Sequence, residues 1–312
     1  MLSLMKTEGD KSGDSSSFSN LPDEMVLLIL REVIDLKTLC LFKLVCKRFN
    51  QIVLHVDTIF LNVPLIENLS SDSNTLDESS DSFLSCFKSL LSFKGLKSLH
   101  IELPPSVNDD ENGFFFKWKF ILGEKIDFFV FHSPNSVCDT KENVQDEEED
   151  DLVLATQKRI IAIRCVVNAL FRRKILLATI DTFPLLEKIS ITDSGKRGRV
   201  SHSGEKVVEL RNGLSSHPET LNKVHSRLSR CYVPLLELPV SGYVMKGVTL
   251  ILLERTNLGN DKNDSSMKSD DHYDNFMSNY DDDSVFEDNE EAAYSEAVME
   301  IFKKHRGRIK RL

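Results

Sequence analysis

The sequence predicts an α/β protein with a small N-terminal unit of three helices, an irregular α/β region after it, and acidic disordered segments. Three observations predict this class. Residues 18–54 are dense in apolar residues and contain no glycine. Downstream, apolar residues at helical spacing alternate with short runs that have the period of two typical of strands. Two polar, strongly acidic stretches interrupt that pattern, as disordered segments do.

Composition limits the class of protein further. The net charge of −10 is concentrated in residues 141–151 and 261–296, so the remainder of the chain is mildly basic. Residues 1–17 lack the apolar core of a signal peptide and are predicted to be a disordered leader. The six cysteines are scattered without a C-x-x-C pair, which indicates reduced thiols in the nucleus and/or cytoplasm. No apolar run is long enough to suggest a membrane span.

The first predicted helix has too much apolar surface for a unit of its size. Pro22 fits its first turn, and residues 25–30 (MVLLIL) are apolar at six consecutive positions. At helical spacing these side chains point all round the axis. Asp35 can cap a second helix, and a third is predicted over 44–54. About 35 residues rarely form a stable core alone, so we expect the excess apolar surface to be buried against something else, either the rest of this chain or a partner.

The ordered residues of this unit resemble an F-box. The resemblance lies in Leu21-Pro22-x-Glu24, Ile29-Leu30-x-x-Val33, Asp35-Leu36 and the run LVCKRF at 44–49. It assigns residues 18–62 to the F-box and implies docking on a Skp-type adaptor, which connects it to a cullin and a ubiquitin-conjugating enzyme. Carried over residue by residue, the implied adaptor contacts are Leu21, Pro22, Ile29, Leu36, Val45, Cys46 and Lys47.

Residues 63–256 are predicted to be an irregular α/β region that binds the substrate. A helix starting at 81 or 82 leads through Gly95 to a strand over 96–103, which is the order of a leucine-rich-repeat unit. A predicted helix over 152–179 is followed by a similar sequence segment at 183–191, where Leu186, Ile189 and Ile191 match Leu96, Leu99 and Ile101. Roughly ninety residues separate the two segments, so any repeat is irregular.

The remaining elements follow from the same patterns. Strands are predicted over 114–118, 125–132, 206–210, 227–233 and 247–255, with residues 128–131 (FFVF) buried on both faces. An acidic loop is expected near 135–151 and a disordered acidic segment over 257–289. Residues 290–312 are expected to form an amphipathic helix with a basic end. The phrases LLSFKGLKSLHIELP, LLEKISITD and VPLLELPVSGYVMKGVTLILLE are similar to a plant F-box group described as auxin-up-regulated, across most of 18–256.

No catalytic motif is recognisable, and we expect a non-enzymatic protein without a cofactor or metal. Two basic features are candidate anion sites. One is the turn carrying Lys196, Arg197 and Arg199, which could contact an acidic or phosphorylated substrate. The other is the C-terminal HRGRIKRL with Lys303 and Lys304, which could be a nuclear-localisation or anion-binding tail. The residues that bind the substrate are otherwise not predictable.

Two functions are compatible with these patterns. The first is the substrate receptor of a Skp/cullin/F-box ubiquitin ligase, which presents an unknown protein for ubiquitination. The second is a helix-turn-helix-like nucleic-acid-binding regulator, with Lys43, Lys47, Arg48, Asn50 and Gln51 facing a groove. The all-round apolar first helix favours the first function, because a groove-binding unit needs a polar outer face.

Overall fold

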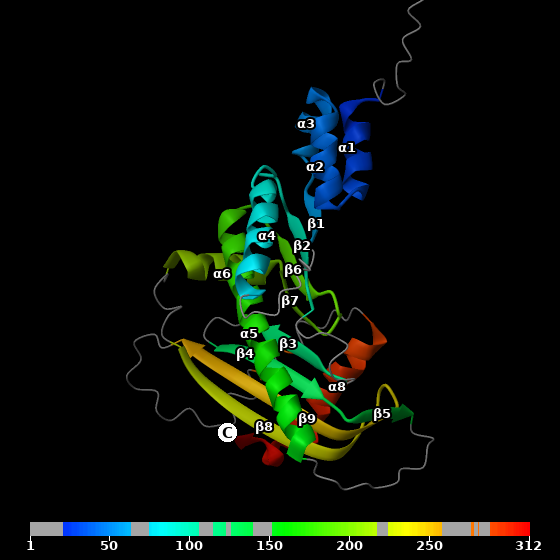
Figure 1. The fold of residues 1–312 in the computed structure, drawn as a ribbon, viewed down its shortest axis with the longest axis vertical. Helices are drawn as coiled ribbons and strands as arrows, with labels where there is room; N and C mark the ends of the chain where they lie inside the picture. Colours follow the sequence, from blue (N-terminus) through cyan, green and yellow to red (C-terminus); the bar gives the residue numbers. More distant parts are fainter. Residues whose placement is uncertain are drawn as a thin grey trace, which may run out of the picture.

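The computed structural model describes residues 21–63, 75–105, 115–122, 126–139, 152–216, 224–257, 276–277, 280 and 288–312. The predicted leader over 1–17 lies outside these residues. Three helices, α1 (Asp23–Glu32), α2 (Leu36–Val45) and α3 (Lys47–Val53), form a unit at one end of the molecule (Figure 1). Among the described helices, none is long and apolar enough to cross a membrane.

Local chemistry accounts for where these helices begin and end. Pro22 precedes α1, whose first turn carries Asp23 and Glu24 at the positive end of the helix. The Asp35 carboxylate accepts hydrogen bonds from the Thr38 N–H at 2.8 Å and the Thr38 hydroxyl at 2.7 Å, which caps α2. Cys46 has extended backbone and separates α2 from α3. The expected start of the third helix at Leu44 is therefore wrong, because α2 continues to Val45.

The strands form one mixed sheet within the described residues, in the order β1-β2-β6-β7-β3-β4-β9-β8-β10, with β5 paired to β9. The strands are β1 (Thr58–Asn62), β2 (Ser98–Leu103), β3 (Lys117–Ile121), β4 (Ile126–Ser133), β5 (Ser136–Asp139), β6 (Lys188–Asp193), β7 (Gly198–Ser203), β8 (Val224–Glu237), β9 (Tyr243–Asn257) and β10 (Lys310–Arg311). The α/β class is thus confirmed. Strand β1 lies within the predicted 18–62 unit but belongs to the sheet.

The first three strands of the sheet are parallel. Strand β2 pairs with β6 so that Leu99 lies opposite Ile189 and Ile101 opposite Ile191, which places the two similar segments side by side. The intervening helices are α4 (Thr75–Leu90) and α5 (Leu152–Thr182). Beyond β6 the sheet is mixed, since β7 runs antiparallel to β6. The leucine-rich-repeat interpretation therefore rests on two neighbouring units and stays a prediction.

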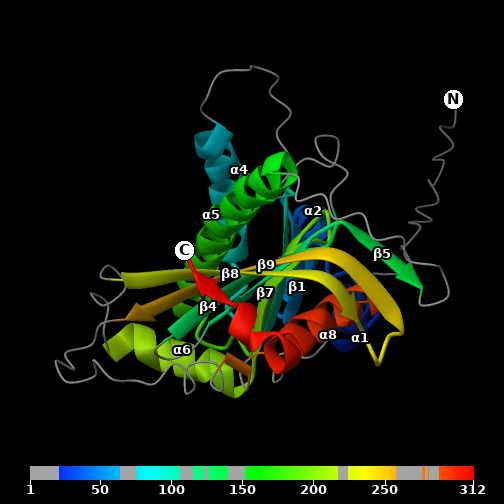
Figure 2. The same ribbon diagram turned by 90° about the horizontal axis from the view of Figure 1, so that it is seen from below.

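The other half of the sheet, from β3 to β10, is antiparallel, and its strand β4 is buried on both faces. Phe129 and Phe131 of β4 belong to one core with α5, whereas Phe128 and Val130 belong to a second core with α8 (Asn289–Lys304). Figure 2 shows α4 and α5 on one side of this sheet and α8 on the other. The prediction that 128–131 are buried on both faces is confirmed.

Four further expectations require correction. Residues 206–210 belong to a helix, α6 (Glu205–Ser216), which begins after Gly204 turns the chain at φ +59°. Residues 136–139 of the expected acidic loop form β5, and 140–151 lie outside the described residues. Phe276 and Tyr280, in the segment expected to be disordered, are helical and buried. The C-terminal helix ends at Lys304, and the chain continues as a short 3-10 turn (Arg306–Arg308) and β10, which pairs with β8.

Candidate functional site

The first candidate site is the outer surface of the three-helix unit. In α1, Val26 and Leu30 are buried, whereas Met25 is 48% exposed, Leu28 53% and Ile29 41%. The exposed positions 25, 28 and 29 have the spacing of neighbours on one helix face. The first helix is thus apolar towards its own core and also towards solvent, as the sequence predicts.

Helix α2 has the same two-sided character. Leu36 and Leu39 point into the core, while Leu44 is 81% exposed and Val45 64%. Burying such side chains against a partner is favourable by about 1.5–3 kcal/mol each. We call the exposed apolar residues of the helical unit the apolar surface; they are Met25, Leu28, Ile29, Ile34, Leu41, Leu44 and Val45.

The predicted adaptor contacts divide between this surface and the interior. Pro22, Ile29, Val45, Cys46 and Lys47 are exposed, and Leu21 is half-buried against the core. Leu36 is only 5% exposed and supports the unit from inside, so it is not part of the apolar surface. The apolar surface also contains Met25, Leu28, Ile34, Leu41 and Leu44, which are not among the predicted adaptor contacts; the first two lie in the unbroken apolar run at 25–30.

The helical unit is firmly joined to the sheet. The Phe60 N–H in β1 donates to the Ile34 carbonyl at 2.7 Å, and Arg31 pairs with Asp57 at 3.3 Å. Lys43 donates to the Ser92 hydroxyl at 2.8 Å. The buried residues of α1, α2 and α3 belong to the same apolar core as those of β1 and β2. The orientation of the apolar surface relative to the sheet is therefore fixed by packing.

These contacts bear on the nucleic-acid alternative. Lys43 lies on the sheet side, where its ammonium stands 5.3 Å from the centre of the Phe93 ring. Arg48 pairs with Asp23 at 2.7 Å. Two of the five residues expected to face a groove are thus engaged within the protein, and α3 is only seven residues long. The helical unit fits apolar docking better than groove binding.

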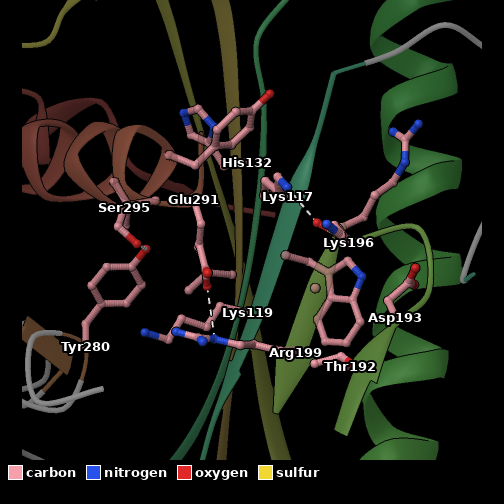
Figure 3. Close-up of a pocket in the computed structure, with 16 residues that line it drawn as sticks. Lys117, Lys119, His132, Thr192, Asp193, Lys196, Arg199, Tyr280, Glu291 and Ser295 are labelled. Atoms are coloured by element: carbon pink, nitrogen blue, oxygen red, sulfur yellow. Dashed lines mark hydrogen bonds and ion pairs between the residues drawn. The ribbon is translucent and has the colours of Figure 1, made fainter. Parts of the chain in front are cut away.

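The second candidate site is a pocket on the sheet, where β3 meets β7 (Figure 3). Its basic residues are Lys117 and Lys119 of β3, Lys196 and Arg197 of the β6–β7 turn, and Arg199 of β7. The turn expected from sequence to bind anions thus forms one wall. Lys117 and Lys119, which sequence reasoning missed, reach the pocket because Lys119 pairs directly with Arg199 across the parallel strands.

Helix α8 and Tyr280 close the other side of this pocket. Glu291 pairs with Arg199 at 3.0 Å, and Glu290 pairs with Lys117 at 3.4 Å. The Lys119 ammonium lies 4.7 Å from the centre of the Tyr280 ring. In Figure 3 the side chains of Lys119, Arg199 and Glu291 converge. The acidic first turn of α8 therefore neutralises part of a strongly basic site.

A buried ion pair holds the β6–β7 turn. Asp193 accepts a hydrogen bond from the Gly195 N–H at 2.8 Å, and its second oxygen lies 3.5 Å from Arg172 of α5. The Lys196 backbone has φ +53° and its N–H donates to the Asp193 carbonyl at 2.8 Å. Asp193 is therefore occupied in shaping the turn that carries Lys196 and Arg197.

The basic C-terminal residues do not form a comparable site. Lys303 and Lys304 both pair with Glu300, at 3.8 and 2.6 Å, as neighbours on one helix surface do. Lys310 and Arg311 lie in β10 at the edge of the sheet. Among the described residues, no group of histidine, cysteine and carboxylate side chains is arranged to hold a metal ion.

Comparison with known proteins identifies the class of the helical unit. Residues 18–59 match the family model described as F-box-like, which covers α1, α2 and α3. The chain is therefore an F-box protein. It is distantly similar to two F-box proteins of Arabidopsis thaliana. AUF2 is 24% identical over 76% of this chain and 84% of the relative, and AUF1 is 24% identical over 93% and 97%. No solved structure matches the chain.

Proposed function

We propose that this protein is the substrate-recognition subunit of a Skp/cullin/F-box ubiquitin ligase, acting in the nucleus or cytoplasm. The observation that carries the proposal is the apolar surface of a domain that matches the F-box-like family. Exposed apolar side chains grouped on small helices mark protein interaction sites. The partner is a Skp-type adaptor, and through it a cullin. The proposed adaptor contacts are the rest of the apolar surface together with Leu21, Pro22, Ile29, Val45, Cys46 and Lys47.

The proposed mechanism is positional and makes no covalent bond within this chain. A receptor raises the effective concentration of a substrate lysine near the ubiquitin-conjugating enzyme. That gain requires a fixed geometry between the docking unit and the substrate-binding region. The shared core of α1–α3 with β1 and β2, and the hydrogen bond from Phe60 to Ile34, support such a geometry.

The test replaces two exposed apolar residues with charges. In the full chain, Leu44→Asp with Val45→Asp should weaken binding of a purified Skp-type adaptor by at least about 30-fold, the cost typical of an interface hot spot. Because both side chains are mostly exposed, the free energy of unfolding should change little. Calorimetric titration of the adaptor measures the affinity, and urea denaturation checks the fold.

A matched control carries the same charges elsewhere. Leu185 and Val240 are 55% and 89% exposed and lie outside the helical unit, so Leu185→Asp with Val240→Asp should bind the adaptor like the unmodified chain. Equal affinity of the two double variants would contradict the proposed docking surface.

A further inference from the structure

Helix α5 is apolar on two opposite sides. Towards the sheet it buries residues such as Ile161, Cys165 and Leu176, which belong to the same core as β2 and β6. A second apolar set faces away from the sheet and is between 36% and 63% exposed. A surface helix usually turns one apolar stripe inward and a polar face to water. We call this second set the α5 seam; it consists of Val153, Ile160, Ile163, Val167 and Phe171.

The seam residues lie on one narrow strip of the helix. At 3.6 residues per turn, their side chains fall within about 80° of the helix circumference and extend over about 27 Å. Val153, Ile160 and Val167 recur every seven residues, and Ile163 lies between the last two. This is the heptad pattern with which one helix packs along another. The seam therefore has the form of one half of a helix–helix contact.

Two buried cations fix the rotation of α5. The Lys158 ammonium donates to the Ser133 carbonyl of β4 at 3.0 Å and to the Gly247 carbonyl of β9 at 3.1 Å. Arg172 donates to the Pro104 carbonyl at 3.1 Å. Both cationic side chains are at most 2% exposed and lie on the side of the helix opposite the seam. Because turning the helix would break these buried hydrogen bonds, the seam is held towards solvent.

The charges that border the seam have one sign. Between 152 and 180, α5 contains no aspartate or glutamate. Its exposed charged residues there are Arg159, Arg164 and Lys174. At helical spacing Arg159 and Arg164 lie along opposite edges of the seam, and Lys174 extends its C-terminal end. Whatever covers the seam therefore meets positive charge on both edges, which favours an acidic partner.

Three other occupants fit the seam less well. A second copy bound through the same strip would bring arginine against arginine, whichever way the two helices run. The acidic residues 140–151 precede α5, but their one large apolar residue is Val144, which is too few to cover the strip. Helices that lie on lipid surfaces use tryptophan, phenylalanine and leucine on their apolar face, whereas four of the five seam residues are valine or isoleucine.

We propose that the α5 seam binds an amphipathic helix of a partner protein, in which apolar heptad positions are bordered by aspartate and glutamate. The apolar side chains of that helix pack between Ile160, Ile163 and Val167. Its carboxylates pair with Arg159 and Arg164 at the two edges. The apolar contacts supply most of the affinity, and the charges select acidic over basic helices. This docking does not rest on the proposed function.

The seam is preformed and separate from the apolar surface of the helical unit. Helix α5 packs on β4, β6 and β7, and Figure 2 shows it on the side of the sheet opposite α8. In Figure 1, α1–α3 lie at one end of the molecule, and α5 runs from the opposite end towards the middle. Because the sheet already holds α5, docking requires no ordering of this helix. A helical partner and an adaptor can therefore bind at the same time.

The experiment titrates the full chain with two labelled synthetic peptides of about four heptads and follows fluorescence anisotropy. Both peptides carry isoleucine and leucine at the apolar heptad positions. One has glutamate at the bordering positions, and the other has lysine. We expect the acidic peptide to bind at least about tenfold more tightly at low salt, and the difference to shrink at high salt because exposed charges are screened.

Two double variants separate the apolar contribution from the charge contribution. Ile160→Gln with Val167→Gln should weaken binding of the acidic peptide by at least about tenfold, because two apolar side chains leave the contact. Arg159→Glu with Lys174→Glu leaves the seam intact and should reverse the preference, so that the basic peptide binds more tightly. All four positions are exposed, and glutamine and glutamate are good helix formers, so urea denaturation should show an unchanged fold.

The matched control is Leu185→Gln with Val240→Gln, because both residues are exposed apolar residues outside α5. This variant should bind both peptides like the unmodified chain. Equal binding of the two peptides, no binding of either, or full binding by the Ile160→Gln, Val167→Gln variant would overturn the proposal. So would two results without peptide binding: dimers of the chain that dissociate in that variant, which would assign the seam to a second copy, or binding to phosphatidylserine vesicles that the variant loses, which would assign it to a lipid surface.

Discussion

Replacing Phe276 tests whether the acidic C-terminal segment is anchored to the folded protein. Phe276 is 1% exposed, and its ring centre lies 4.6 Å from that of Phe302 and 5.1 Å from that of Phe128. Phe276→Ala removes these contacts and leaves a cavity, which in protein cores costs about 3–5 kcal/mol. This is a large part of the roughly 5–15 kcal/mol that stabilises a typical protein. With a denaturant slope of about 3 kcal/mol/M, the urea midpoint should fall by about 1 to 1.7 M.

The control for this prediction is Phe115→Ala. Phe115 is 52% exposed, so removing its ring should lower the midpoint far less. Equal midpoints for Phe276→Ala and Phe115→Ala would refute the reasoning and restore the expectation of disorder for this part of the segment.

Two further predictions concern the lining of the pocket. Burial, assisted by the charge of Lys158, lowers the pKa of His132 to about 3. Below about pH 6.5 the unfolded chain binds a proton at this residue and the folded protein does not. The free energy of unfolding should therefore fall as pH falls from about 6.5 towards 3, by at most about 1.4 kcal/mol per pH unit. His132→Phe should remove this contribution to the pH dependence of the free energy of unfolding, which urea titrations at several pH values measure. The same pH dependence in the variant and in the unmodified chain would contradict the prediction. A Cβ atom at Gly198 would lie 2.1 Å from the Trp118 ring, so Gly198→Ala should destabilise the protein by about 1–3 kcal/mol. Gly213→Ala, in α6 with no atom within 4 Å of the added Cβ, should be neutral or stabilising by up to about 1 kcal/mol, and a similar loss in both variants would show that the Trp118 contact is not the cause.

Elements with a clear apolar period were predictable from the sequence. The long helix α5, the strands β2 and β6 and the doubly buried β4 appear where the pattern places them. The acidic segment was misjudged because its charges dominate its composition. Phe276 and Tyr280 are four residues apart, which is the spacing of one helix face, and both are buried. Their spacing was the local signal that part of this segment packs on the fold.

The apolar surface was predictable in kind but not residue by residue. A run of six apolar residues requires two buried faces, and the structure shows one of them exposed in α1. Which residues lie on which face depends on where each helix starts. Because α2 extends through Val45, Leu44 belongs to the exposed side of α2, while Leu36 in its first turn points inward. The sequence alone does not determine which residues of each helix face solvent.

The basic pocket depends on a pairing that local sequence does not encode. Residues 117–119 and 196–199 are far apart in the chain, and they meet because β3 lies parallel to β7, with Trp118 opposite Gly198. Only glycine allows this approach, since any Cβ at 198 would overlap the Trp118 ring. The same register puts Lys119 beside Arg199. The close packing of Gly198 on Trp118 is therefore accompanied by a contact between two like charges. Glu291 of α8, which pairs with Arg199 at 3.0 Å, offsets part of this repulsion.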